Sequence, residues 1–331
     1  MPKIYRDNPK DIASVARLLR EGSLVALPTE TVYGLAANTF NPDACRRIFE
    51  IKGRPLIDPL IVHINTWSQA YLLALMNSSA EKLAKVFWPG PLTLVLPKKD
   101  CVPNIVTASL PTVALRMPSH PLMMKVLAQS ECPLAAPSAN PFGYVSPTLA
   151  KHVIKMLGTD LNHILDGGKC KYGIESTVVD LSDQLNPRIL RLGAITEEEI
   201  NACLGFNVPR VSSINYKQGT KGLPSPGLMG KHYSPNAKLE LFKGETPPLR
   251  DKIKKTATIF FQRRQTIERT RLSNCFWLCE DGKPETAAQH LFDLLQQLDQ
   301  ENYEVITVEL APEQGIGAAI NDRLQRAAVN Y

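Results

Sequence analysis

Two cations separated by a single glycine, Lys52-Gly53-Arg54, are the sharpest chemical signal in the sequence. In an extended segment both side chains point to one side, about 7 Å apart, and repel by roughly 2 kcal/mol at an effective dielectric near 20. A polyanion would relieve that repulsion. The glycine allows close backbone approach, and arginine offers a bidentate fork for phosphate oxygens. The segment therefore predicts a phosphate site, with a solvated loop as the alternative.

Two further polar residues interrupt short apolar runs. Arg116 lies in the run 113–117, and a permanently charged guanidinium is costly to bury without a partner. Arg116 must therefore meet an anion, from either a protein carboxylate or a ligand. His63 interrupts the run 60–64, where a lone histidine is more often a satisfied core or edge residue than a site residue.

Compact polar segments follow or precede several other apolar runs. They are Thr29-Glu30-Thr31, Ser138-Ala139-Asn140 and Glu175-Ser176-Thr177. Open α/β sheets bind ligands at strand ends, so we expect these groups to contribute to one site. The sequence has no Gly-Lys-Ser/Thr phosphate loop, no Cys-His or Gly-x-Ser-x-Gly nucleophile signature and no metalloprotease helix. The remaining chemistry is positioning and charge neutralisation, which suits phosphoryl or nucleotidyl transfer.

Hydrophobic periodicity predicts the elements that position these groups. An amphipathic helix with apolar residues from Ile12 to Leu19 ends at a Gly22 cap. Strands are expected at 24–27, 60–64, 92–96, 113–117, 134–136, 177–181 and 189–192. Helices should follow Pro121 and the pair Ser146-Pro147, where serine can cap and proline can take the first helical position. A capping box at Thr196–Glu199 predicts a last helix, and residues 1–206 form one α/β domain with a mixed sheet.

The pattern changes after this first domain. Residues 207–236 are rich in Gly, Pro, Ser and Lys and form an interdomain linker that can also serve as an active-site lid. In residues 237–331, strands near 239–242, 258–261, 276–278 and 305–308 alternate with helices near 285–298 and 315–328. This alternation predicts a small, largely parallel, Rossmann-like α/β domain. The fragment Gly315-Ile316-Gly317 follows the last strand and is interpreted as a helix start.

Composition narrows the class of protein. The 331 residues carry a formal charge of +6, contain no apolar run long enough to span a membrane, and begin without a secretion signal, so a cytoplasmic location is expected. Seven scattered cysteines predict no disulfide framework, and no metal-ligand cluster is visible. Basic residues gather at Lys252, Lys254, Lys255, Arg263, Arg264, Arg269 and Arg271, either as a solvated face or as an RNA contact.

The ordered set of motifs resembles the YrdC-like family of threonylcarbamoyl-AMP synthases, in its long two-domain form. The resemblance rests on residues 28–35, Lys52-x-Arg54-Pro55, residues 59–63, 88–93, 115–118, 136–140, 173–177 and 190–193, and it continues through the linker into the C-terminal region. It implies that threonine captures bicarbonate or carbon dioxide, that the carbamate attacks the α-phosphorus of ATP, and that pyrophosphate leaves. The product would serve the threonylcarbamoyl modification of adenosine next to the anticodon in tRNA.

Carried over residue by residue, the resemblance implies two sets of site residues. Threonine would be held by Thr31, His63, Arg116 and Ser176. ATP would be bound by Lys52, Arg54, Ser138, Asn140, Ser146, Arg191, His232 and Tyr233, with Lys52 and Arg54 acting as the catalytic residues. Magnesium would bridge the phosphates of ATP without a dedicated protein site.

The linker motif Ser225–Pro235 is similar to the lid motif of the family, but its middle departs. Leu228, Met229, Gly230 and Lys231 stand where the family usually has methionine, lysine, tyrosine and arginine. Leu192 also replaces a common proline. His232 and Tyr233 match, so the lid is still expected to close over the nucleotide.

Two other functions compete with the synthase. An RNA-binding module without catalysis would show salt-sensitive RNA binding and no ATP turnover. Carbamoyl transfer in metallocentre maturation also uses a YrdC-like domain, but it would bring fused acylphosphatase and zinc-finger domains that this chain lacks. The synthase implies ATP, L-threonine and bicarbonate as substrates and a tRNA-modifying threonylcarbamoyl transferase as partner, with tRNA itself a further candidate and no membrane partner.

Overall fold

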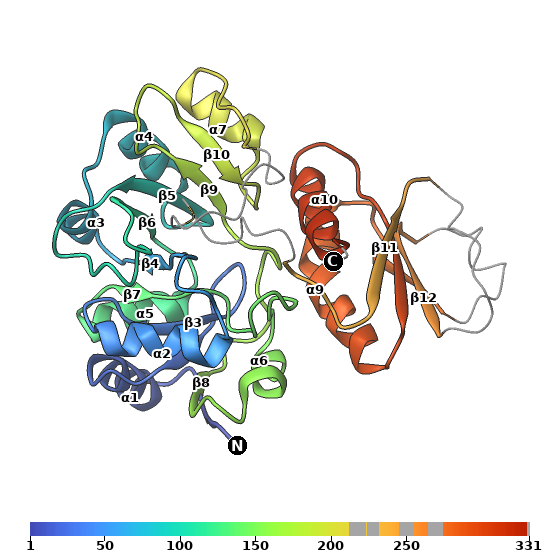
Figure 1. Ribbon diagram of the computed structural model, residues 1–331, viewed down its shortest axis with the longest axis horizontal. Coiled ribbons are helices and arrows are strands. Elements are labelled where there is room, and N and C mark those ends of the chain that lie inside the picture. The colour runs from blue at the N-terminus through green and yellow to red at the C-terminus, as the bar shows by residue number, and fades with distance from the viewer. Residues whose placement is uncertain (212–222, 224–231, 245–254, 264–273, 330–331) are drawn as a thin grey trace.

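The computed structural model describes residues 1–211, 223, 232–244, 255–263 and 274–329 of the chain, and within them it shows two domains, each built on its own sheet (Figure 1). The larger domain carries a mixed sheet with the strand order β1-β8-β2-β3-β7-β4-β6-β5-β9-β10. These strands are β1 (Lys3–Tyr5), β2 (Val25–Leu27), β3 (Gly34–Asn38), β4 (Ile61–His63), β5 (Leu92–Pro97), β6 (Thr112–Arg116), β7 (Leu134–Ala135), β8 (His163–Leu165), β9 (Thr177–Asp180) and β10 (Arg188–Arg191). The predicted mixed sheet is confirmed.

Helices cover both faces of this sheet. They are α1 (Pro9–Arg20), α2 (Pro42–Lys52), α3 (Trp67–Leu73), α4 (Ser78–Phe87), α5 (Pro121–Ser130), α6 (Ala150–Leu157) and α7 (Glu197–Leu204). Helices α1 and α5 pack on β2 through Leu19, Leu122 and Val126. On the opposite face, α2, α4 and α6 bury Ile48, Leu83 and Val153 against the sheet, where they share a core with Val62 and Leu115.

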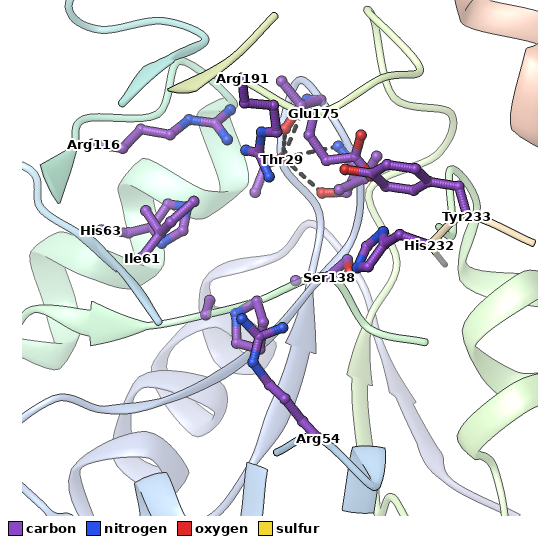
Figure 2. A pocket seen from close by; sticks show the side chains of 15 residues that line it. Thr29, Arg54, Ile61, His63, Arg116, Ser138, Glu175, Arg191, His232 and Tyr233 are labelled. Carbon is purple, nitrogen blue, oxygen red and sulfur yellow. Dashed lines mark hydrogen bonds between the residues drawn. The ribbon is translucent and has the colours of Figure 1, made fainter. Parts of the chain in front are cut away.

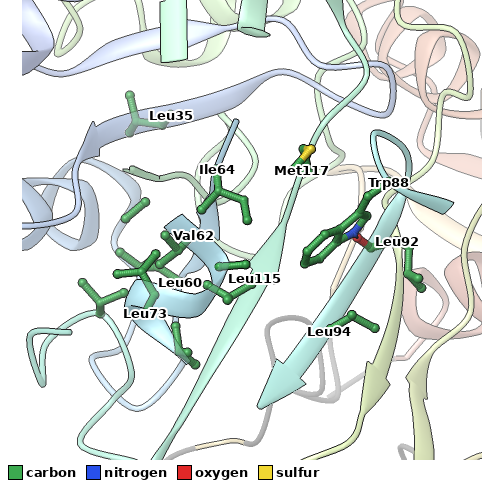
Figure 3. Close-up of a cluster of buried hydrophobic side chains, with 14 of the residues drawn as sticks. Leu35, Leu60, Val62, Ile64, Leu73, Trp88, Leu92, Leu94, Leu115 and Met117 are labelled. Atoms are coloured by element: carbon green, nitrogen blue, oxygen red, sulfur yellow. The ribbon is translucent and has the colours of Figure 1, made fainter. Parts of the chain in front are cut away.

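The main core also lies on that opposite face. Leu35, Val62, Leu115 and Leu94 point into it from neighbouring strands (Figure 3). The indole of Trp88 is buried beside them, and its N–H donates to the carbonyl of Leu92 at 2.7 Å, which satisfies its polar atom. A rigid core on this face fixes the register of β4, β6 and β5.

Strand alternation then decides what the first face of the sheet presents. Because successive side chains point to opposite faces, placing Val62 and Leu115 in the core puts Ile61, His63 and Arg116 on the other side. Helices α1 and α5 cover only part of this side. The polar residues of β4 and β6 therefore face a region of the sheet that loops and the second domain close.

The second domain is a four-stranded parallel sheet with the order β11-β14-β12-β13. Its elements are β11 (Lys238–Phe242), β12 (Thr256–Gln262), β13 (Cys275–Cys279), α9 (Pro284–Gln300), β14 (Val305–Glu309) and α10 (Ile316–Ala327). All four strands were anticipated from sequence, and α10 begins next to Gly315, whose φ of 54° suits glycine. The expected small parallel α/β domain is confirmed.

Helices α9 and α10 lie on the side of the second sheet that faces the first domain (Figure 1). Several polar contacts cross between the domains here, among them three made by α9. The hydroxyl of Tyr144 donates to Asp299 at 2.5 Å, His152 Nε2 lies 3.0 Å from Asp293, and Gln296 donates to the carbonyl of Ser146 at 2.9 Å. Val32, Val145 and Ile174 of the first domain join the apolar core of the second. The two domains therefore share a packed interface.

Local signals were read correctly at most helix ends. Gly22 follows α1 with a φ of 89°, and the capping box of α7 forms as predicted, with Thr196 and Glu199 satisfying each other's backbone amides. The helix expected directly after Ser146-Pro147 is wrong in its start. Helix α6 begins at Ala150, and Ser146 makes no cap because its hydroxyl donates to Glu175.

No helix in the described part of the chain is long and apolar enough to cross a membrane. Lys252, Lys254, Arg264, Arg269 and Arg271 of the predicted basic group fall outside the described residues. Arg263 lies over the ring of Trp277 and pairs with Glu280 on β13's exposed end, so this member of the group already has protein partners.

Candidate active site

A small buried pocket lies on the face of the first sheet that presents His63 and Arg116 (Figure 2). Its free volume is about 40 Å³. It is lined by Thr29, Thr31, Val32, Gly34, Arg54, Ile61, His63, Arg116, Ala136, Pro137, Ser138, Glu175, Arg191, His232 and Tyr233. Six of these side chains carry or can carry charge, which is unusual for a space so well shielded from water.

His63 and Arg116 are brought together by strand register. They are direct partners in the parallel pair β4–β6, and Figure 2 shows both on the same side of the pocket. Arg116 Nη2 donates to Glu30 Oε1 at 2.7 Å, and both side chains are 4% exposed. The anion that the sequence required for Arg116 is therefore a protein carboxylate in this structure, while Nε of Arg116 keeps no hydrogen-bond partner among the described residues.

Electrostatics fix the charge states on this side. Burial alone would raise the pKa of Glu30, but the Arg116 guanidinium holds it below its ordinary value. Burial and the nearby Arg116 lower the pKa of His63 to about 3, so its imidazole is neutral at pH 7. The pocket thus offers a fixed cation, a fixed anion and a neutral imidazole within one small volume.

The Lys52-Gly53-Arg54 segment differs from its predicted geometry. It is a helix terminus rather than an extended segment: Lys52 ends α2, and Gly53 caps the helix in the left-handed conformation with a φ of 61°. Both cations are still buried. Lys52 Nζ donates to the carbonyls of Ser138, at 2.7 Å, and Asn140, whereas Arg54 pairs with Asp58 at 2.9 Å.

Several cations lie close enough to depress each other's protonation. Burial, followed by the charge of Arg54, lowers the pKa of Lys52 well below its ordinary value. Burial and the cations Arg54, Lys52, Arg326 and Arg191 do the same for the pKa of His232. Fields of this sign favour an anion at the pocket.

Among the other predicted site residues, Arg191 lines the pocket, whereas Ser176, Ser146 and Asn140 are not among its lining residues. Arg191 donates to the carbonyl and, at 3.0 Å, to the hydroxyl of Ser176, which also lies 2.8 Å from Thr93. Ser146 donates to Glu175 at 2.5 Å. Asn140 donates to two backbone carbonyls, and its Oδ1 has no hydrogen-bond partner among the described residues.

His232 and Tyr233 close the pocket opposite His63 and Arg116 (Figure 2). Tyr233 adopts a φ of 63°, which is uncommon for an aromatic residue. Its ring stacks on Phe292 of α9 at 5.6 Å, and Arg323 of α10 lies 5.0 Å from its centroid. The remainder of the predicted lid motif, residues 225–231, lies outside the described residues.

Three charged residues of the site were not identified as site residues from the sequence. Glu30 stands within the quoted 28–35 motif, and Glu175 within 173–177, so their positions were flagged but not their roles. Arg323 belongs to α10, in the second domain, and pairs with Glu175 at 2.8 Å. No local pattern marks it, because only the packing of the two domains brings it to the pocket.

Two protein-family models match the sequence. The model described as "Telomere recombination" matches residues 17–193, and the model described as "Threonylcarbamoyl-AMP synthase, C-terminal domain" matches residues 195–329. The threonylcarbamoyl-AMP synthases of Pyrococcus abyssi and Bacillus subtilis are 40% and 42% identical over 96% and 97% of this chain, and each is covered over 94% of its own length.

Solved structures and shorter relatives add to this comparison. The crystal structure of P. abyssi Sua5 complexed with L-threonine has a TM-score of 0.88 and 38% identity, and the match covers 99% of this chain and 97% of that one. The threonylcarbamoyl-AMP synthase of Vibrio vulnificus is 34% identical over 186 residues, which are 55% of this chain and 98% of the relative. These findings confirm the family resemblance inferred from the motifs.

Proposed function

The chain belongs to the threonylcarbamoyl-AMP synthase family, and we propose that its buried pocket joins L-threonine, bicarbonate and ATP into threonylcarbamoyl-AMP with release of pyrophosphate. One observation carries the assignment of this reaction to this pocket. Among the described residues, buried polar atoms without a hydrogen-bond partner gather around it, including Nδ1 of His63, Nε of Arg116, Oδ1 of Asn140 and Nδ1 of His232. Such atoms cost about 1 to 3 kcal/mol each unless a ligand satisfies them.

The side formed by β4 and β6 suits threonine. Nη2 of Arg116 is held by Glu30 while Nε has no hydrogen-bond partner among the described residues, so we infer that the guanidinium can meet the amino acid's carboxylate without leaving its ion pair. The neutral imidazole of His63 can hydrogen-bond the threonine hydroxyl, and Thr31 lies on the same wall. The P. abyssi relative, whose structure was solved with L-threonine, supports this class of substrate.

The basic side suits the nucleotide. Lys52 and Arg54 lie at the end of α2, next to the backbone of residues 138–140, which Lys52 binds directly. We assign to Lys52 and Arg54 the role of stabilising the negative charge that develops on the phosphates. Ser138, Asn140, Ser146 and Arg191 would complete the nucleotide side, and His232 with Tyr233 would cover it.

The proposed reaction has two steps. The neutral amine of threonine attacks bicarbonate or carbon dioxide and forms an N-carboxylate, with loss of water when bicarbonate is used and loss of a proton when carbon dioxide is used. An oxygen of this carbamate then attacks the α-phosphorus of ATP, the bond from that phosphorus to the β-phosphate bridging oxygen breaks, and pyrophosphate carries away the electron pair. The residues of the pocket contribute by holding the carbamate and ATP in line.

Exclusion of water supports the same assignment. A carbamate and an acyl-adenylate both hydrolyse readily, so the reaction needs a closed site. Here His232 and Tyr233 are 6% and 1% exposed and leave only about 40 Å³ of free space. That is room for little more than a water molecule, so both residues must move aside when substrates enter.

Magnesium is proposed to enter as part of the MgATP substrate. The described residues contain no group of three or more His, Cys, Asp or Glu side chains that could hold a metal ion. The carboxylates at the pocket are engaged with arginines, Glu30 with Arg116 and Glu175 with Arg323. The ligands of magnesium would therefore be phosphate oxygens of ATP and water molecules.

The chemistry of the product implies a partner. Threonylcarbamoyl-AMP is a mixed anhydride, and hydrolysis in solution would remove the activation that allows its acyl group to be transferred. A second enzyme must therefore consume it promptly. We propose a threonylcarbamoyl transferase that acts on tRNA adenosine, in line with the expectation drawn from the sequence.

Pyrophosphate release tests the proposed function. Purified protein is given MgATP, L-threonine and bicarbonate, with each omitted in turn, with serine replacing threonine, and with a chelator added. We expect release only when all three substrates and magnesium are present, and weaker release with serine. Pyrophosphate release that is independent of threonine, or absent from folded protein under every condition, would reject the proposal.

A further inference from the structure

Arg323 is an arginine of the second domain that is buried at the wall of the first domain's pocket. Its side chain is 0% exposed. Nε donates to Glu175 Oε2 at 2.8 Å, and Nη2 donates to the carbonyl of Leu192 at 2.7 Å. Nη1 is held by its own neighbour Asp322 at 2.6 Å. Arg323 is thus fixed in one orientation by contacts to both domains.

Glu175 links Arg323 to Ser146, on the proposed nucleotide side of the pocket. Its Oε2 accepts from Arg323, and its Oε1 accepts from the hydroxyl of Ser146 at 2.5 Å. Glu175 lines the pocket, and its side chain is 8% exposed. In the described part of the chain, Arg323 is the cation with which Glu175 forms an ion pair. Without it, the buried carboxylate would lose its ion-pair partner.

The backbone around Ser146 and Glu175 is also held by the second domain. Gln296 of α9 donates to the carbonyl of Ser146 at 2.9 Å, so the second domain holds this carbonyl directly and the Ser146 hydroxyl through Glu175. Gly193 follows the Leu192 carbonyl that Arg323 binds. A Cβ at Gly193 would lie 2.4 Å from the carbonyl carbon of Ser176, so the chain approaches here as only glycine permits.

A shorter relative offers a comparison for the contact between Arg323 and Glu175. The V. vulnificus synthase is too short to contain a second domain, since 186 aligned residues account for 98% of it. A single domain therefore suffices for an enzyme of that name. In this chain, by contrast, Arg323 of the second domain pairs with Glu175, which lines the pocket, so the catalytic domain draws on the second domain for the geometry of the site.

We propose that Arg323 is a positioning residue: by holding Glu175, and through it Ser146, it keeps the nucleotide side of the pocket in its binding geometry. The inference rests on the proposed function in taking that side as the ATP site. It assigns to the second domain a direct role in ATP affinity, beyond joining the domains.

Four variants and one control separate positioning from general stability. Arg323→Met removes the charge at similar length, Arg323→Lys keeps it, Glu175→Gln neutralises the carboxylate, and Arg323→Met/Glu175→Gln removes both charges. Tyr144→Phe is the control, because it deletes one interdomain hydrogen bond, to Asp299, outside the pocket. Thermal unfolding and equilibrium binding of MgATP are measured for each, together with the KM for ATP and for threonine.

We expect Arg323→Met to weaken MgATP binding and raise the KM for ATP about 10-fold, the equivalent of roughly 1.4 kcal/mol. The KM for threonine should stay within about 2-fold of the wild type. Arg323→Lys should recover most of the loss. The double variant should unfold at a higher temperature than Arg323→Met, because no buried charge is left unpaired, without recovering ATP affinity.

Equal MgATP affinities for Arg323→Met and Tyr144→Phe would overturn the inference, as would a double variant that binds ATP like the wild type. The binding measurement does not depend on turnover. A wild-type protein that binds MgATP but releases no pyrophosphate would therefore reject the proposed function, while the comparison of affinities still decides the role of Arg323.

Discussion

Arg116 gives the most demanding test of the threonine side, because its guanidinium pairs with Glu30 and is also proposed to bind the threonine carboxylate. In the free protein Nη2 is bound to Glu30 at 2.7 Å, and Nε has no hydrogen-bond partner among the described residues. Replacing Arg116 with methionine removes the proposed charge-assisted contact to the threonine carboxylate. Such contacts are worth about 1.5 to 3 kcal/mol, so the KM for threonine should rise roughly 10- to 150-fold.

The same change has a second effect that must be separated from the first. Glu30 is 3% exposed, and without Arg116 its carboxylate would be buried without its ion-pair partner, which costs about 3 to 5 kcal/mol of folding free energy. The double variant Arg116→Met/Glu30→Gln removes both charges, so its stability should return most of the way to that of the wild type. Its KM for threonine should remain high.

The assay is the threonine dependence of pyrophosphate release, with urea unfolding measured on the same protein. Glu30→Gln alone serves as the control, because it keeps the guanidinium, and its KM for threonine should change less than about 5-fold. The KM for ATP should stay near that of the wild type in all three variants. A folded double variant whose KM for threonine lies within about 2-fold of the wild type would refute the role of Arg116.

Other predictions follow from the remaining groups. In the folded protein the pKa of His63 is lowered to about 3, so between pH 6.5 and 3 the unfolded chain binds one more proton than the folded chain. The free energy of unfolding should therefore fall by up to about 1.4 kcal/mol per pH unit as the pH drops through that window. Urea unfolding at pH 7 and pH 5 should show a smaller loss of stability in His63→Gln than in the wild type, and an equal loss would contradict the assignment. Lys52→Met should lower kcat about 100- to 1000-fold in the pyrophosphate assay; a kcat within 10-fold of the wild type would remove Lys52 from catalysis. Thr196→Ala, which breaks the capping box with Glu199, should cost about 1 kcal/mol in urea unfolding and leave kcat unchanged.

The fold was largely predictable because its signals are local. Short apolar runs bounded by turn residues marked the strands, and Thr196 with Glu199 marked a helix start by a reciprocal hydrogen bond that needs no tertiary context. Ser146-Pro147 looked equally like a helix start. Tertiary structure decided otherwise, because a buried carboxylate at Glu175 gains more from the serine hydroxyl than a helix end would.

Several residues singled out in the sequence line one pocket, but the geometry of that pocket was not predicted. Lys52 and Arg54 were expected to point to one side of an extended segment, whereas they lie at a helix terminus, where Gly53 caps α2 and both side chains are buried. The demand of Arg116 for an anion was sound physical reasoning, but the sequence left open whether a protein group or a ligand supplied it. Only the fold identifies Glu30 and shows that Nε of Arg116 has no hydrogen-bond partner among the described residues.

The distribution of buried charge around the pocket favours the binding of anionic substrates. Three carboxylates in or next to the pocket are each engaged by an arginine: Glu175 by Arg323, Glu30 by Arg116 and Asp58 by Arg54. Among the described residues, Lys52 and Arg191 have only carbonyl and hydroxyl oxygens as partners. Two buried cations without carboxylates raise the energy of the free enzyme, as the lowered pKa of Lys52 reflects. On the proposed function, phosphates bound at this position would remove that penalty, and groups already in place would meet the charge that develops on them in the transition state.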